Sequence, residues 1–485
     1  MPSGEAAGLD ILGLDPDSLP GGWRATTMGE VAEVVGGATP RVSEPGNFAD
    51  EGSAWITPAD LGGFNGVRIR RGARCLTERG LRGCSARMMP AGTVLMSSRA
   101  PIGYVAVAEG PISTNQGFKS FVCQEGLAPE YVYYWLRFAN PLLQAMGSGS
   151  TFTEISGRRA REIPIILPPT DAEQRRIVAT IEELLTHVNV TNERLARVPA
   201  VLKRFRQSVL AAACSGRLTA DWRETAGLEP PDAILAALRG EHEAAGTGLR
   251  RNAALPSEGV HDLDTSALPD QWRASELQWL CEPGRLITYG ILKPGPDFPS
   301  GIPYVRVADY PRDAIRIEGI RRTSPEIAAE YQRAALRYGD VLLAIRGTYG
   351  RVCKVPRELD GANITQDTAR VSVADTINSD YVAWYLRSEA VQKRMQRAAK
   401  GVAVRGVNIG DVRALQIAVP PRPEQDEIVR RVEALFALAD SVGQRVAAAT
   451  ARADRVTQAI LAKAFRGELV PTAGDDAGAT GSNGE

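Results

Sequence analysis

Apolar residues recur every three or four positions along two long stretches of the chain. The first stretch runs from Ile177 to Val209 and the second from Ile428 to Ile460. Steps of four and three alternate along each stretch, which is the heptad pattern of a helix whose apolar seam faces another helix. With a rise of 1.5 Å per residue, each helix would be about 50 Å long. The positions assigned to the helix-pairing seam are Ile177, Ile181, Leu184, Leu195, Leu202, Ile428, Val432, Leu435, Val446 and Ile460.

The alternative is that each helix packs on the surface of its own globular neighbour. A spacing kept close to 3.5 residues over many heptads favours a helix partner over a domain surface. Pro199 falls inside the first stretch, and it lacks the N–H that a helix interior needs. We therefore expect a kink or a break in the first helix, whereas the second helix has Thr450 at the corresponding position.

The chain is a tandem duplication, because short motifs occur twice in the same order, about 250 residues apart. Each copy consists of a globular part followed by one long helix. A repeat of this length predicts two similar domains related by a pseudo-twofold axis. The matching motifs are Leu19-Pro20-x-x-Trp23 and Leu268-Pro269-x-x-Trp272, Gly92–Arg99 and Gly339–Arg346, Thr114–Gln116 and Ile364–Gln366, Leu167–Pro169 and Val419–Pro421, Glu173-Gln174 and Glu424-Gln425, and Gly216-x-Leu218 and Gly467-x-Leu469.

Short β-forming runs separated by Gly and Pro turns dominate each globular part. One helix is expected in each part, at Pro129–Phe138 and at Ser379–Lys393. The predicted fold class is therefore α/β, with two similar mixed, β-rich domains joined by two long helices that form an antiparallel coiled coil. The expected strands are Val67–Ile69, Thr93–Met96, Tyr104–Val107, Ile163–Leu167, Val341–Ile345, Arg370–Val373 and Leu415–Val419.

Composition shifts along the chain predict its domain boundaries. Small, acidic and Gly-containing residues at the N-terminus and Gly, Ala and Asp at the C-terminus indicate disordered ends. The linker holds one short amphipathic segment, Ala233–Leu238. The expected parts are a disordered 1–18, a first domain 19–170, a first helix 171–220, a linker 221–267, a second domain 268–421, a second helix 422–470 and a disordered tail 471–485.

Several classes of protein are disfavoured by composition. No apolar run approaches the roughly 20 residues that span a bilayer, and the acidic N-terminus is unlike a signal peptide, so a cytoplasmic protein is expected. The six cysteines are scattered without a CxxC pair, and only three histidines are present, which disfavours a metal site or a His-based hydrolase. No metal and no catalytic residue is therefore assigned.

Motifs for catalysis are also missing. The run Leu167-Pro168-Pro169 resembles the Pro-Pro core of amino-methyltransferases, but these enzymes need Asn or Asp where Leu167 and Val419 stand. The glycine-rich run Gly147–Thr151 is not followed by GKS or GKT, so it is not a P-loop. We interpret the chain as non-catalytic.

Two clusters of basic residues indicate a nucleic-acid partner. The chain has 57 basic and 57 acidic residues, so local distribution matters more than net charge. Val67–Arg87 contains seven arginines and one acid, and Gln392–Arg413 contains six basic residues and one acid. Such clusters can neutralise phosphates and release counterions. The alternative for each cluster is an ordinary solvated basic face.

Polar residues at matching strand ends and loops are candidates for DNA contacts. An arginine or glutamine there can reach a base edge or a phosphate, although a structural ion pair or a loop-fixing hydrogen bond is the alternative. Small hydroxyls and free N–H groups in the Gly147–Thr151 loop suit a phosphate. The assigned DNA-binding residues are Arg68, Arg70, Arg71, Ser98, Arg99, Gln116, Lys119, Ser148, Ser150, Thr151, Arg346, Thr348, Tyr349, Gln366, Lys400 and Arg405.

Over residues 19–470 the sequence resembles the specificity (S) subunit of type I restriction–modification systems. The resemblance rests on the Leu-Pro-x-x-Trp openings, the Pro-Pro…Glu-Gln junctions, the heptad helices and the Gly-x-Leu endings. It implies that residues 19–170 and 268–421 are target-recognition domains, each reading half of a split double-stranded DNA site. It also implies that the two long helices pair antiparallel as a spacer and bind two methyltransferase (M) subunits.

The resemblance further implies that restriction (R) subunits join this host-defence complex. S-adenosylmethionine, ATP and Mg are then expected on the partner subunits, and no cofactor on this chain. The expected function is a non-catalytic DNA-specificity subunit that reads a bipartite, asymmetric site for DNA methylation and restriction. Two alternatives stay open, a DNA adenine methyltransferase-type enzyme and a coiled-coil adaptor without DNA binding.

Overall fold

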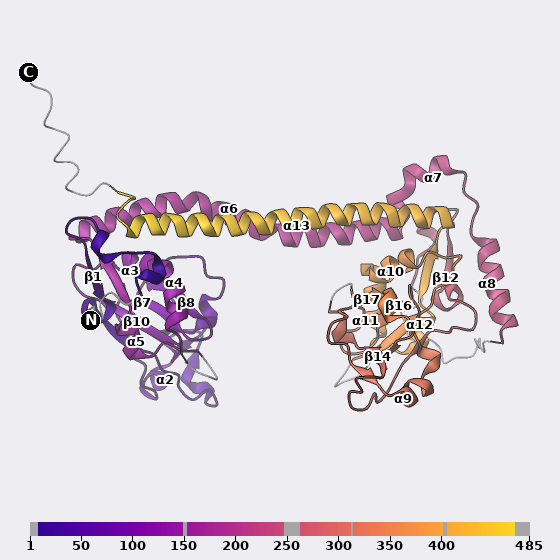
Figure 1. Ribbon diagram of the computed structural model, residues 1–485, viewed down its shortest axis with the longest axis horizontal. Coiled ribbons are helices and arrows are strands. Elements are labelled where there is room, and N and C mark those ends of the chain that lie inside the picture. The colour runs from indigo at the N-terminus through magenta and orange to yellow at the C-terminus, as the bar shows by residue number, and fades with distance from the viewer. Residues whose placement is uncertain (1–7, 149–152, 247–261, 312–313, 401–404, 471–485) are drawn as a thin grey trace, which may run out of the picture. The chain divides into compact units, whose positions relative to one another are not determined.

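The computed structural model describes residues 8–148, 153–246, 262–311, 314–400 and 405–470, which fold into two compact units. Unit 1 comprises Met1–Ala196 with Ala447–Glu485, and unit 2 comprises Arg197–Val446. The boundaries between the units fall within both long helices, α6 (Asp171–Cys214) and α13 (Arg422–Phe465). Each unit therefore contains one globular domain and one segment of each long helix (Figure 1).

The domain of unit 1 is built on a five-stranded sheet in the order β2-β10-β7-β8-β5. A second sheet has the order β3-β6-β4-β9, and β1 pairs with β11. All five residues of β7 are buried, so this strand lies in the middle of the core. The strands are β1 (Arg24–Thr27), β2 (Ala32–Gly36), β3 (Phe48–Ala49), β4 (Ser53–Ile56), β5 (Arg68–Ile69), β6 (Cys75–Leu76), β7 (Val94–Ser98), β8 (Ile102–Ala108), β9 (Ser113–Thr114), β10 (Phe118–Cys123) and β11 (Pro164–Leu167).

Helix α3 holds β11 to the rest of unit 1. The Tyr131 hydroxyl donates to the carbonyl of Ile166 at 2.8 Å, and the Trp135 indole N–H donates to the carbonyl of Pro164 at 2.8 Å. These bonds satisfy polar atoms that are fully buried. The helices of the domain are α1 (Met28–Val31), α2 (Glu78–Arg82), α3 (Pro129–Phe138), α4 (Asn140–Met146) and α5 (Gly157–Arg161).

The domain of unit 2 has sheets in the orders β13-β19-β16-β17 and β15-β14-β18, and β12 pairs with β20. Its strands are β12 (Arg273–Glu276), β13 (Thr288–Tyr289), β14 (Ile302–Val305), β15 (Arg322–Thr323), β16 (Val341–Ala344), β17 (Val352–Lys354), β18 (Asn363–Ile364), β19 (Thr368–Val371) and β20 (Gln416–Val419). Its helices are α7 (Ala220–Ala226), α8 (Asp232–Ala244), α9 (Pro325–Glu330), α10 (Ser379–Arg387), α11 (Glu389–Ala398) and α12 (Ile409–Arg413).

The two domains share one topology. The order β2-β10-β7-β8 in unit 1 corresponds to β13-β19-β16-β17 in unit 2, and the pair β1-β11 corresponds to β12-β20. The parallel pair β4-β9 likewise has its counterpart in the parallel pair β14-β18. The predicted α/β duplication is therefore confirmed, and each of the seven expected β runs overlaps a strand.

The expected helix at Ser379–Lys393 is wrong in one respect, because two helices occupy this segment. Helix α10 ends before Ser388, whose hydroxyl accepts from the N–H of Val391 at 3.5 Å and so caps the start of α11. A serine competes for backbone hydrogen bonds and favours such a cap over a helix interior.

The long helices pair antiparallel within each unit. In unit 1 the start of α6, with Ile177 and Ile181, shares an apolar core with Leu461 and Phe465 at the end of α13. In unit 2 the end of α6 shares a core with the start of α13, and Arg206 on α6 forms an ion pair with Asp440 on α13. The end of α13, which follows the second domain in sequence, therefore packs with the first domain. The end of α6, which follows the first domain, packs with the second domain.

One predicted seam position differs from the structure. Leu184 is 40% exposed, whereas its neighbour Leu185 is 3% exposed and belongs to the core of unit 1. The buried face of this segment follows Ile177, Ile181 and Leu185, spaced by four residues each, because it packs on the globular domain as well as on α13. Of the other seam positions, Ile428 and Val432 are fully buried, and Leu195, Leu202, Leu435, Val446 and Ile460 are partly buried.

We therefore expect Leu185→Ala to destabilise unit 1 by about 2–3 kcal/mol, because it leaves a cavity in a packed core. Leu184→Ala is the matched control, and it should cost less than about 1 kcal/mol because its side chain is already partly in water. Urea unfolding of the two variants measures the difference. Equal losses would contradict this assignment of the buried face.

Pro199 does not interrupt α6, which is a continuous helix of 44 residues. The expected break is therefore wrong. The proline is exposed, so water can solvate the carbonyl whose hydrogen bond it removes. The segment is also paired with α13 in unit 2, where Leu202 lies close to Gly443.

The N-terminal residues that the structure describes are packed, which contradicts the predicted disorder of 1–18 in the part from residue 8 onward. Leu9, Leu12 and Leu14 are buried against Leu142 and Leu143 of α4. The prediction relied on the acidic composition of this segment and gave too little weight to its apolar residues Leu9, Leu12 and Leu14. Residues 1–7 and the predicted disordered tail 471–485 lie outside the described residues.

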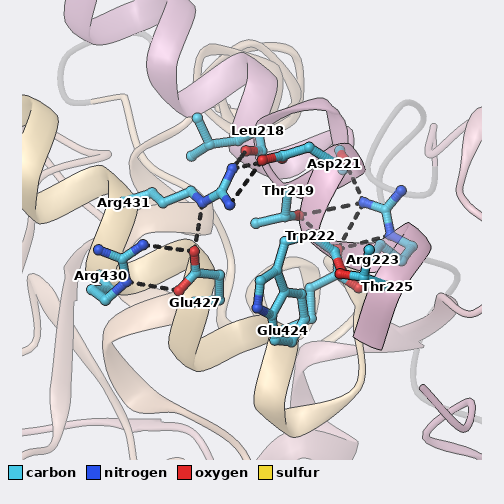
Figure 2. A network of polar contacts seen from close by, with 11 residues as sticks. Leu218, Thr219, Asp221, Trp222, Arg223, Thr225, Glu424, Glu427, Arg430 and Arg431 are labelled. Carbon is cyan, nitrogen blue, oxygen red and sulfur yellow. Dashed lines mark hydrogen bonds and ion pairs between the residues drawn. The ribbon is translucent and has the colours of Figure 1, made fainter. Parts of the chain in front are cut away.

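The linker contains more structure than its one amphipathic segment predicted. Helix α8 continues beyond the predicted segment and buries Leu235, Leu238 and His242 against the domain of unit 2. The imidazole Nε2 of His242 lies 2.9 Å from the carbonyl oxygen of Cys281. The short helix α7 precedes α8, and its residues Asp221 and Arg223 form ion pairs with residues at the start of α13 (Figure 2).

The duplicated motifs form the same junction in each unit. The indole N–H of Trp272 donates to Glu424 at 2.9 Å, and that of Trp23 donates to Glu173 at 3.1 Å. The N–H groups of Ala128 and Asn378 donate to the side-chain oxygens of the neighbouring glutamines, Gln174 and Gln425.

The Gly-x-Leu endings belong to the same junctions. Gly216 lies against Pro269 and Gly467 against Pro20, and both glycines have positive φ. A side chain on either glycine would meet the proline ring of the opening motif. The openings, helix starts and helix endings recur in the sequence because they contact one another.

The junction of unit 2 carries an additional ion network (Figure 2). Glu424 is fully buried and accepts from Thr219 at 2.7 Å and from the guanidinium of Arg223 at 2.7 Å. Arg431 joins Asp221 to Glu427 with distances of 2.7 and 2.6 Å. Hydrogen bonds from Arg430 and Arg431 lower the pKa of Glu427 to about 2, although burial opposes the shift.

Candidate nucleic-acid interface

Arg99 and Arg346 occupy the same position in the two domains, one residue after the end of the central strand β7 and two residues after the end of β16. In unit 1 the N–H of Ser98 donates to Gly117, and the carbonyl of Ser98 accepts from Ile155. In unit 2 the N–H of Ile345 donates to the carbonyl of Asp367, and the carbonyl of Ile345 accepts from the N–H of Val407. The residue before each arginine is therefore fixed by backbone hydrogen bonds to two neighbouring segments.

A short antiparallel backbone pairing lies beside each of these arginines. Ser148 and Glu154 exchange two backbone hydrogen bonds of 3.2 and 3.0 Å, and Lys400 and Gly406 exchange two of 2.9 Å. Glu154 and Gly406 also form β-bridges with Arg99 and Arg346. The candidate residues Ser150 and Thr151 lie outside the described residues.

In unit 1 a charged cluster surrounds the strand end. The ammonium of Lys119 lies 3.1 Å from Glu154 and 3.5 Å from the hydroxyl of Ser98. The guanidinium of Arg99 lies 3.8 Å from the same carboxylate. Gln116 contacts Thr39 through a hydrogen bond between their side chains. The structure therefore brings together Ser98, Arg99, Lys119 and Ser148, four of the residues assigned from sequence.

In unit 2 the matching strand end has no carboxylate at the corresponding position. Arg346 donates to the side-chain oxygen of Gln366 at 3.2 Å, so the two residues that sequence matched are in contact. Lys400, Arg405 and Thr348 are exposed on the adjoining loops, whereas Tyr349 is partly buried and packs against the core. Two of the sequence-assigned cations are thus available to solvent beside Arg346.

Four of the seven arginines of the first basic cluster form ion pairs with acidic residues, and three of these acids lie in distant parts of the sequence. Arg68 forms an ion pair with Glu130, and the guanidinium of Arg71 donates to the carbonyl of Asp50 at 2.8 Å. Further along the cluster, Arg79 pairs with Glu44, Arg82 with Glu78 and Arg87 with Glu33. Arg70 is exposed at the end of β5. The count of arginines in this segment therefore overestimated the positive charge that it offers to a nucleic acid.

The second basic cluster is partly structural. Arg394 is 3% exposed and donates to the carbonyl of Gln416 at 2.8 Å. Arg413 donates to the carbonyl of Ile287 at 2.7 Å, and burial lowers its pKa. Lys393 and Arg397 form ion pairs with Glu389 and Asp262. The candidate interface is accordingly smaller than the two clusters and centres on the strand ends.

Glu154 is the residue of the charged cluster that sequence reasoning did not select. Lys119 and Glu154 are far apart in sequence, so no local pattern joins them. The signal that was available is that an acid stands beside a loop already assigned to DNA binding.

Among the residues with described positions, no group of three or more His, Cys, Asp or Glu side chains could hold a metal ion. Burial raises the pKa of Cys123, Cys214 and Cys281 to about 12, which makes these thiols poor nucleophiles. None of the described helices is long and apolar enough to cross a membrane.

Comparisons with known proteins agree with this architecture. The type I restriction enzyme EcoBI specificity subunit of Escherichia coli is 34% identical over 329 residues, which cover 68% of this chain and 63% of that subunit. The chain therefore spans less than two thirds of the length of this relative. The type I restriction enzyme StySPI specificity subunit of Salmonella potsdam is 26% identical over 472 residues, which cover 93% of this chain and 90% of that subunit.

A solved structure shows the same fold. This protein chain comes from work on the complex assembly and conformational transition of the type I R-M system. It aligns with a TM-score of 0.59 at 20% identity, covering 93% of this chain and 99% of the solved chain. At this identity the likeness concerns the fold alone.

A family model of the type I restriction modification DNA specificity domain matches residues 20–200 and 269–448. The two matches fall on the two copies of the domain and on the first part of the long helix that follows each copy. The chain therefore belongs to the family of type I restriction–modification DNA specificity proteins.

Proposed function

We propose that this chain is the non-catalytic DNA-specificity subunit of a type I restriction–modification complex. The observation that carries the proposal is the pair of equivalent strand ends, at Arg99 and Arg346, in two domains of one topology. A side chain held at a strand end can reach a base edge or a phosphate without a large cost in entropy. The two strand ends differ in their neighbouring side chains, so the two domains read different sequences.

The target is accordingly a bipartite, asymmetric site on double-stranded DNA. The partners are two methyltransferase (M) subunits and restriction (R) subunits, which carry S-adenosylmethionine, ATP and Mg. Family membership and the relatives' names support a role in such a complex. The exposed apolar residues of the helices, Leu184, Val190, Val201, Leu438 and Val456, are available for contact with partner subunits. The cytoplasmic location stays a prediction.

The test is co-expression of the chain with the methyltransferase subunits of its system in a host that lacks adenine methylation. Mapping of the methylated adenines is expected to give one bipartite motif with an unread gap. Exchange of residues 19–170 for those of a relative should change one half of the motif and leave the other half unchanged. A change in both halves would contradict independent reading.

Two measurements separate the alternatives. Methyl transfer or S-adenosylmethionine binding by the purified chain alone would favour a modifying enzyme. Absence of DNA binding by the assembled complex at every salt concentration would favour an adaptor for protein partners.

A further inference from the structure

One ion pair distinguishes the two strand ends, because Lys119 and Glu154 have no charged counterparts in unit 2. Lys119 faces Met96 of β7 across the sheet, and Ala369 faces Leu343 of β16 in the same way. The position of Glu154 beside Arg99 is taken by Gly406 beside Arg346.

The available space explains why unit 2 has Gly406 where unit 1 has Glu154. A side chain at Gly406 would approach within 2.9 Å of both Cγ of Arg346 and the carbonyl oxygen of Ile345. Unit 2 therefore has no room for a carboxylate at this point. Arg346 lies in that space and contacts the neutral amide of Gln366.

In unit 1 the carboxylate of Glu154 is held in place and stays accessible. The side chain of Lys119 is 12% exposed, so its ammonium is largely removed from water and depends on Glu154 and Ser98 for hydrogen bonds. The side chain of Glu154 is 36% exposed. An ionised carboxylate has more lone pairs than these two cations occupy, so it can accept a further hydrogen bond.

These two strand ends suit different base edges in the major groove. Guanine presents two acceptors, which match the donors of an arginine, whereas cytosine and adenine present amino groups, which need an acceptor. A carboxylate only accepts, and it repels phosphate, so it selects an amino group over guanine and over the backbone.

We propose that Glu154 is a specificity-determining residue of the first domain: it restrains Lys119 and Arg99, and it accepts a hydrogen bond from the amino group of a cytosine or adenine in its half-site. The inference rests on the proposed function, because it concerns how the same complex reads DNA. Arg346 in the second domain donates to the neutral amide of Gln366 and keeps its other donors for acceptors on the DNA.

The test is Glu154→Met in the chain assembled with its methyltransferase subunits, since methionine keeps the length of the side chain but has no carboxylate or amide oxygen to accept from a base, whereas glutamine would keep an acceptor. The motif of methylated adenines is expected to lose its preference at one position of the first half-site, by roughly 5- to 100-fold, with the second half-site unchanged. Because Lys119 is released, the slope of log affinity against log salt should also become steeper by about one phosphate contact.

Glu162→Met is the matched control, because Glu162 forms an exposed ion pair with Arg158 in the same domain. It should alter neither the motif nor the salt slope. If Glu154→Met fails to assemble, Glu154→Asp keeps the charge but withdraws it from the base, and the same loss at one position is expected.

An unchanged motif, or a uniform loss of methylation at an unchanged motif, would overturn the inference and assign Glu154 a structural role only. In that case the wild-type complex still gives a bipartite motif, and the proposed function stands. A wild-type complex that gives no bipartite motif would instead contradict the proposed function itself.

Discussion

Phe465→Ala is expected to destabilise unit 1 by about 3–5 kcal/mol, because it empties a large, fully buried site. The ring of Phe465 at the end of α13 is 0% exposed. Its centroid lies 5.4 Å from Tyr131, 5.0 Å from Trp135 and 5.4 Å from Phe138, all on α3. Such aromatic contacts add to the energy of burial. The residue thus attaches the end of the second long helix to the first domain.

Hydrogen exchange measured by mass spectrometry tests this expectation region by region. Amides of α3 and of the end of α13 should exchange faster in Phe465→Ala, while amides of β16 and β19 in unit 2 keep their wild-type rates. Val456→Ala is the matched control on the same helix, since Val456 is 43% exposed. Unchanged exchange in α3 would show that the helix end does not stabilise the first domain.

Arg223→Met should destabilise unit 2 by about 3–5 kcal/mol, because it leaves a buried carboxylate without its counter-charge. Glu424 is fully buried, and Arg223 donates to it through Nε at 2.9 Å and Nη2 at 2.7 Å. Thr219 and Trp272 would keep their hydrogen bonds to Glu424, but neither carries a charge. Urea unfolding measures the lost free energy of unfolding. Hydrogen exchange of the amides of β12 and α7 then shows whether the loss is local to this junction.

Two further variants make the test of the Arg223 contact specific. Arg430→Met removes an arginine of the same network that is 67% exposed, so it should cost less than about 1 kcal/mol. Glu424→Gln added to Arg223→Met should regain part of the lost stability, because an uncharged amide is less costly to bury than a carboxylate. Similar losses in Arg223→Met and Arg430→Met would contradict a special role for the buried pair.

The candidate interface was predictable only in part. Arg99, Arg346 and Gln366 were found because duplication matched them, and the structure places them on equivalent strand ends. The extent of the basic clusters was not predictable, because Glu33, Glu44 and Glu130 are distant in sequence from the arginines that they pair with. Glu154 was missed for the same reason, since its partner Lys119 lies on another element of the domain.

The sequence by itself determined the duplication, the order of strands and helices, and the two long helices, because apolar periodicity and repeated motifs are local along the chain. Only the tertiary structure decided that Leu185 and not Leu184 is buried, that Leu9, Leu12 and Leu14 pack into a core, and that Glu154 neutralises Lys119. These outcomes depend on contacts between segments far apart in sequence. Burial and electrostatic pairing are properties of such contacts, and the pattern within one segment does not contain them.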